Sequence, residues 1–146
     1  MRALSLLVVL ASAFLLSSCS GERQVQVVTP GIDRRRIEWS ETEQGQIFAF
    51  KQLHSQAGTS THGLRLAGDS GSRVHDHHDL LAVVLSGAAD VRLSGKWHSV
   101  AAGDVIEIPR GQPYRFERKG APAPTEFYLV FYPPYDGKDL RMVEGK

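Results

Sequence analysis

Three imidazoles and two carboxylates lie next to one another in this 146-residue chain, in the run His75-Asp76-His77-His78-Asp79. The run holds half of the six histidines. Neutral imidazoles and carboxylates are the ligands that borderline divalent cations such as Zn, Ni, Fe or Mn accept in proteins. The run therefore predicts a site for one divalent transition metal.

The local conformation of this run decides which of its side chains can meet. In an extended segment, residues two apart point to the same face, so His75, His77 and Asp79 would converge on one ion. We expect His75 and His77 as nitrogen ligands, with Asp79 or His78 as a third ligand. His78 and Asp79 also have simpler interpretations, because His78 can face solvent and Asp79 can cap a turn.

The chain from Ile37 onward predicts an all-β fold. Short apolar segments, alternating or continuous, recur between Gly, Pro, Asp and Ser residues, a pattern typical of a β-sandwich or barrel. Runs with a helical period are absent. The sequence predicts strands at about residues 45–53, 61–67, 80–86, 90–93, 97–100, 104–108, 114–117 and 125–132.

Turn residues organise the middle of the chain. Gly87 and Gly95 each stand where a tight reversal needs positive φ, so residues 80–100 predict three consecutive antiparallel strands. Pro109 sets φ for a further turn that Gly111 closes. The strand after this turn carries Tyr114 and Phe116 on one face.

These residues resemble the cupins, whose second sequence motif has Gly followed after five residues by Pro-x-Gly. Gly103 and Pro109-Arg110-Gly111 match that spacing, and residues 80–87 match the strand and turn of the first motif. The resemblance covers roughly residues 47–139. It implies a small single-domain cupin, that is, a double-stranded β-helix or jelly-roll barrel, which we expect over residues 37–146.

The metal-binding positions of the family match less well. The usual Glu falls on Leu80, and the usual His of the second motif falls on Tyr114. The His pair aligns in two ways: read literally it is His75 and His77, whereas counting back from the first motif's glycine gives Arg73 and His75. We prefer the literal pair, with Tyr114 as a phenol ligand, as a hydrogen-bond donor to a bound oxygen, or as core packing.

The resemblance leaves the reaction open, because the family includes dioxygenases, isomerases, lyases and decarboxylases. One hypothesis is an enzyme in which a divalent metal polarises a small oxygen-bearing molecule. Alternatively, the barrel binds a sugar or a small acid without turnover, as the changed ligand positions favour. A third hypothesis is pH sensing by the clustered imidazoles.

Residues 1–18 predict a secretory signal, with a basic start, an apolar run and small residues before Cys19. The string Leu16-Ser17-Ser18-Cys19 resembles the lipobox of bacterial lipoproteins, which implies cleavage before Cys19 and its acylation by chains such as palmitate. Cys19 is the only cysteine, so an internal disulfide is excluded. Ser20 favours the outer membrane, facing the periplasm. Residues 19–36 then form a lipidated, flexible tether.

With 17 basic and 16 acidic residues, the chain has no excess of positive charge that would attract a nucleic acid, so the sequence predicts no nucleic-acid partner. The expected partners are therefore a small-molecule ligand and, through lipidated Cys19, a membrane. A homodimer is a further expectation. An apolar strand such as residues 125–132 could either form its interface or lie in the interior of the barrel.

Overall fold

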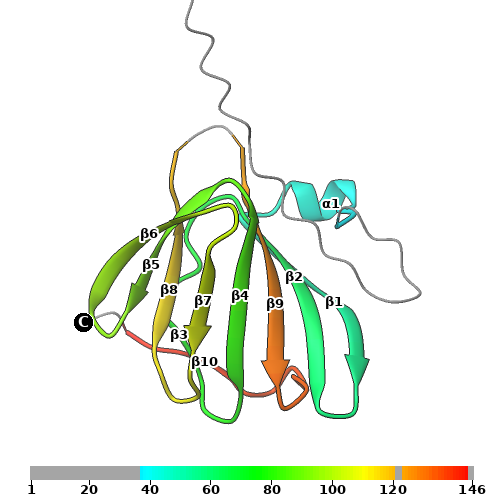
Figure 1. Ribbon diagram of the computed structural model, residues 1–146. Helices are drawn as coiled ribbons and strands as arrows, with labels where there is room; N and C mark the ends of the chain where they lie inside the picture. Colours follow the sequence, from blue (N-terminus) through cyan, green and yellow to red (C-terminus); the bar gives the residue numbers. More distant parts are fainter. Residues whose placement is uncertain (1–36, 121–122, 145–146) are drawn as a thin grey trace, which may run out of the picture.

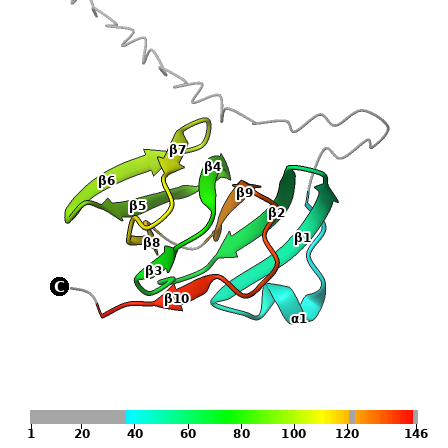
Figure 2. The ribbon, with the colours of Figure 1, turned by 90° about the horizontal axis from the view of Figure 1, so that it is seen from below.

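Two five-stranded antiparallel sheets face each other in the computed structural model, which describes residues 37–120 and 123–144 (Figures 1 and 2). The elements are α1 (Glu41–Gln44), β1 (Phe48–Gln56), β2 (Thr59–Leu66), β3 (Arg73–His75), β4 (Asp79–Ser86), β5 (Ala88–Leu93), β6 (Lys96–Ala101), β7 (Val105–Ile108), β8 (Tyr114–Arg118), β9 (Thr125–Tyr132) and β10 (Leu140–Met142). One sheet has the order β1-β2-β9-β4-β7, and the other has the order β10-β3-β8-β5-β6. The predicted jelly-roll barrel is confirmed.

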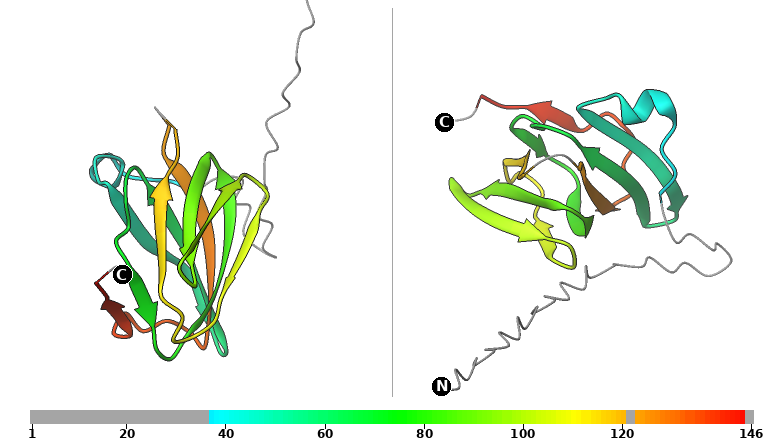
Figure 3. Two further views of the ribbon diagram at one scale, coloured as in Figure 1. Left: turned by 90° about the vertical axis from the view of Figure 1, so that its left-hand side faces the viewer. Right: turned by 90° about the horizontal axis from the view of Figure 1, so that it is seen from above.

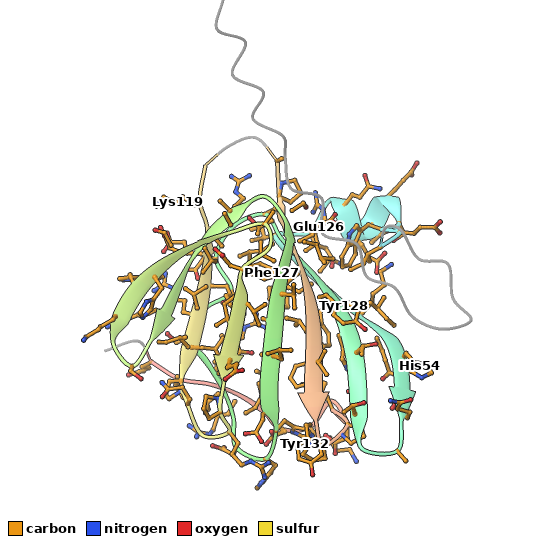
Figure 4. The ribbon with its side chains drawn as sticks, in the orientation of Figure 1. His54, Lys119, Glu126, Phe127, Tyr128 and Tyr132 are labelled. Atoms are coloured by element: carbon orange, nitrogen blue, oxygen red, sulfur yellow. The ribbon has the colours of Figure 1, made fainter. Side chains whose placement is uncertain are left out.

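Alternating side chains fill the space between the sheets. Phe127, Leu129 and Phe131 of β9 are buried, whereas the residues between them are partly exposed, and Tyr132 at the strand's end is exposed. The inward-facing residues of the other strands join them in one apolar cluster. Figure 4 shows Glu126 and Tyr132 at opposite ends of β9, so this strand runs the length of the barrel.

The expectation of three consecutive antiparallel strands over residues 80–100 is wrong for the first pair. β4 pairs with β7 and β9 in one sheet, whereas β5 pairs with β6 and β8 in the other. Gly87 is therefore a corner at which the chain changes sheets, and the pairing of β4 with β9 is already irregular between Val84 and Ser86. The turn through Ser94 and Gly95 does form the predicted hairpin between β5 and β6.

One short helix was not predicted. The single turn of α1 lies beside β1 (Figure 3) and begins with a capping box between Ser40 and Glu43. The Ser40 backbone N–H donates to the Glu43 carboxylate over 2.7 Å, and the Glu43 N–H donates to Ser40 Oγ over 3.3 Å. Across residues 37–120 and 123–144, no helix has the length and apolar character needed to span a membrane.

The sequence also did not predict the two three-residue strands β3 and β10. β10 pairs with β3, with Leu140 opposite His75. The segment between β9 and β10 turns inward at Tyr135, whose ring stacks on that of Phe131 with centroids 4.9 Å apart. The predicted signal peptide (1–18), lipidated Cys19 and tether (19–36) lie outside the described residues.

Candidate functional site

Three polar side chains meet on the inner face where β3 lies against β8. Arg73 stands opposite Tyr114 in the strand pairing, so the two side chains share a face. His75 lies two residues further along β3 and points the same way. Its Nε2 is 3.0 Å from the hydroxyl oxygen of Tyr114. The guanidinium, the imidazole and the phenol therefore form one polar patch inside the barrel.

This patch lines a cavity of about 90 Å³ between the sheets. The rest of its wall is mainly aromatic and aliphatic and includes Phe48, Leu64, Phe116, Leu129, Phe131 and Tyr135. Leu140 of β10 completes the wall, so the C-terminal segment contributes two of the lining residues. The cavity combines a largely apolar interior with a few convergent polar groups, as small-molecule sites do.

A second group of polar side chains lies beside the cavity and shares His75 with it. The potential ligand atoms of His75, His78 and Asp139 all lie within 4.8 Å of one another. Oδ2 of Asp139 is 2.6 Å from Nδ1 of His78 and 3.8 Å from Nδ1 of His75. Both imidazoles are buried, and only 5% of the Asp139 side chain is exposed. Two imidazoles and one carboxylate thus surround a single point.

Backbone amides of the histidine run hold Asp139 in place. The N–H groups of Asp76 and His77 donate to its carboxylate over 3.1 and 3.0 Å, because the chain bends there instead of continuing β3. Burial alone would raise the pKa of Asp139. The hydrogen bonds from His78 and His77 outweigh burial, so the pKa of this carboxyl lies below its ordinary value. Asp139 is therefore an ionised, oriented carboxylate.

Burial sets the protonation states on the cavity side. It lowers the pKa of His75 to about 4, although the charge of Asp139 opposes the shift. It also raises the pKa of the Tyr114 phenol above its ordinary value. At neutral pH His75 is consequently a neutral imidazole, the form that binds metals, and Tyr114 keeps its hydroxyl hydrogen.

The structure does not bring His77 and Asp79 to this group. β3 ends at His75, and the bend at Asp76 and His77 leaves the His77 side chain exposed. Asp79 instead pairs with Arg110 over 2.6 Å, and the hydrogen bonds from Arg110 lower the pKa of this carboxyl to about 2. The two-residue alternation holds only within β3, so it relates His75 to Arg73 and not to His77.

Asp139 was missed because it approaches from the far end of the sequence. Nothing in the local pattern of residues 133–139 shows that this segment folds back under the histidine run. Arg73 was identified only through the less favoured alignment of the His pair. Of the predicted site residues, His75 and His78 join Asp139, and Tyr114 contacts His75.

A jelly-roll barrel of two facing antiparallel sheets is a double-stranded β-helix. The chain belongs to this class of fold. Residues 64–131 match the cupin domain family. The chain therefore carries a small cupin domain. No curated protein matches the chain.

Solved structures agree on the fold. A Klebsiella pneumoniae protein with a double-stranded β-helix domain has a TM-score of 0.60 and 22% identity, with 75% of this chain and 91% of that chain covered. KdgF from Halomonas sp. has a TM-score of 0.59 and 20% identity over 68% and 89% of the two chains. The cupin domain of Schizosaccharomyces pombe Cnp3 has a TM-score of 0.56 and 18% identity, and the match spans 60% of this chain and 66%, just under two thirds, of that chain. At such identities the likeness shows the fold alone.

Proposed function

We propose that this protein is a lipid-anchored cupin that binds a divalent transition metal through His75, His78 and Asp139 and a small oxygen-bearing molecule in the adjoining cavity. The observation that carries the proposal is Nδ1 of His75. This buried nitrogen has no hydrogen-bond partner among the described residues and stands 3.8 Å from the Asp139 carboxylate. An unpaired buried polar atom costs about 1–3 kcal/mol, and coordination of an ion would remove that cost.

The donor set fits such an ion. Atoms that share one tetrahedral metal at about 2.0–2.2 Å lie about 3.3–3.6 Å apart. The distances of 2.6 and 3.8 Å from the Asp139 oxygen bracket that spacing. Two imidazoles and one carboxylate leave positions open for a ligand. The hydrogen that His78 Nδ1 can donate to Asp139 is the one that a metal would displace.

The same arrangement prepares Tyr114 to meet a ligand. When Nδ1 of His75 serves as the donor atom to a metal, Nε2 keeps its hydrogen and donates it to the Tyr114 oxygen 3.0 Å away. The Tyr114 hydroxyl hydrogen is then free to donate to an oxygen atom inside the cavity. A metal held by His75, His78 and Asp139 would act as a Lewis acid towards an oxygen-bearing molecule.

Metal content tests the proposal directly. Untagged wild-type protein, purified without added metal, is expected to contain about one equivalent of a transition metal, measured by inductively coupled plasma mass spectrometry. The double variant His75→Ala/His78→Ala should lose it. The variant His77→Ala is the matched control, because His77 belongs to the same run but is exposed. Retention of metal by the double variant, or wild-type content below about a tenth of an equivalent, would contradict the proposal.

A second candidate function is metal-independent binding of a sugar or a small acid. Two positions at which the family's motifs place metal ligands favour it. Leu80 stands in place of the usual Glu and is buried in the apolar cluster, and Tyr114 stands in place of the usual His. Under this alternative, stabilisation of the protein by its ligand would survive treatment with a chelator. Under the metal-dependent function, the chelator would abolish it.

The cellular location remains a proposal drawn from the sequence. Acylation of Cys19 would hold the barrel at a bacterial membrane, and Ser20 favours the outer membrane with the barrel in the periplasm. A ligand taken from the periplasm would then reach the cavity without crossing the inner membrane.

A further inference from the structure

Arg73 brings a half-buried positive charge to the cavity without an acidic partner. No carboxylate of the described residues forms an ion pair with it. Asp69, whose charge acts on Arg73, is bound by Arg115 instead. One guanidinium nitrogen, Nε, donates to the carbonyl oxygen of Ser70 over 2.7 Å. The remaining donors of the fork meet no carboxylate within residues 37–120 and 123–144.

The surroundings of this guanidinium are those of a ligand-binding arginine. Its central carbon lies 3.7 Å from the centroid of the Phe48 ring, which orients the planar group by stacking. Arg73 is only partly exposed, so its charge is partly removed from water. A desolvated charge is costly unless an anion pairs with it, and the guanidinium fork matches the two oxygens of a carboxylate.

The size and lining of the cavity limit the rest of the ligand. Its volume of about 90 Å³ is smaller than the roughly 150 Å³ of an engineered apolar cavity that holds benzene, so the enclosed part accepts only a few heavy atoms. Leu64, Phe116 and Leu129 present apolar surface to it. Arg73 is the one fully charged cation in the described lining. A ligand with one carboxylate and a short hydrocarbon chain would match this charge and the apolar wall.

We propose that the cavity binds a short-chain monocarboxylate, with Arg73 as the partner of the carboxylate and the apolar wall around its hydrocarbon part. This inference rests on the proposed function only in that a small molecule occupies the cavity. It does not require the metal, because Arg73 is not one of the three grouped ligands.

Matched acids and amides test the inference. Untagged protein in low-salt, carboxylate-free buffer is titrated calorimetrically with acetate, propanoate and butanoate, and with the corresponding neutral amides. We expect the acids to bind at least about tenfold more tightly than amides of the same shape, because charge-assisted hydrogen bonds are lost with the amide. The variant Arg73→Gln should remove this preference. Arg65→Gln is the control and should keep the preference for acids. It removes one positive charge from the outer side of β2, where Arg65 forms a hydrogen bond only to the Gln46 carbonyl among the described residues.

Three outcomes would overturn the inference: equal affinity for acids and amides, no acid binding by wild-type protein, or an equal loss in Arg65→Gln. If Arg73→Gln does not fold, Arg73→Lys takes its place, since it keeps the charge but not the fork, and weaker acid binding is expected. Metal content measured on the same samples separates the two proposals. Acid preference without metal would contradict the metal site alone, and metal without acid preference would contradict this inference alone.

Discussion

His62 lies at the centre of the contacts that hold the C-terminal segment against the barrel. Only 2% of this residue is exposed, and its ring stacks on Phe50 with centroids 4.8 Å apart. Nε2 of His62 is 2.9 Å from Ser60 Oγ, which in turn accepts the backbone N–H of Tyr135 over 2.8 Å. His62 and Ser60 thereby hold Tyr135 where it lines the cavity.

The buried position of His62 predicts a loss of stability in acid. Burial lowers its pKa from an ordinary value of 6.5 to about 4, so the unfolded chain takes up a proton that the folded chain rejects. The stabilisation is complete above pH 6.5 and is lost as the pH falls towards 4. His62 contributes up to about 3 kcal/mol to the loss in the free energy of unfolding, which urea titrations across this pH range would measure. His75, whose pKa is lowered to the same value, adds to the measured loss.

A glutamine variant isolates this contribution. His62→Gln should be less stable than wild type at pH 7 but should show a flatter fall between pH 6.5 and 4. His98→Gln is the control, because His98 is exposed on β6 and its loss should leave the wild-type slope. An unchanged slope in His62→Gln would show that other groups carry the acid sensitivity.

Among the elements, the corner between β4 and β5 is constrained by both its backbone conformation and crowding. Gly87 adopts φ +76°, and a Cβ atom there would lie 3.0 Å from the Pro124 carbonyl oxygen and 3.1 Å from Thr125. Gly95 in the β5–β6 hairpin has nearly the same φ, +78°, but open space around it. Substitution of Gly95 therefore tests backbone strain alone, whereas substitution of Gly87 tests backbone strain together with crowding.

Alanine at these two glycines should have unequal effects. Gly95→Ala adds only the left-handed backbone strain, about 1–2 kcal/mol. Gly87→Ala adds crowding against β9, so a total loss of about 2–4 kcal/mol is expected. Urea unfolding midpoints of the two variants measure the difference. Equal losses would mean that the start of β9 moves away without cost.

For the whole molecule, the proposed lipid anchor predicts a single acylated residue. Cys19 is the only thiol in the chain, and protein expressed in a Gram-negative bacterium should incorporate labelled palmitate. Cys19→Ser should abolish the label, whereas Ser20→Ala should keep it, because acylation is attached at the cysteine. Label retained by Cys19→Ser would contradict the lipoprotein assignment.

Strands with a clear alternation were predictable from the sequence alone. The predicted strand at residues 125–132 coincides with β9, whose inward residues are large and apolar and whose end is set by two prolines. β3 and β10 have three residues each, too few for a two-residue period to be recognised. Their pairing with each other depends on a return of the chain that no local pattern encodes.

The sequence by itself determined the class of fold and the presence of imidazoles able to bind a metal, because hydrophobic alternation and residue type are local properties. Only the tertiary structure decided which groups meet. It ended β3 at His75, turned His77 outward, and brought Asp139 to His75 and His78 from the other end of the domain. It also placed Arg73 beside Tyr114. Contacts between distant segments follow from sheet pairing and chain reversal, which depend on the packing of the whole barrel.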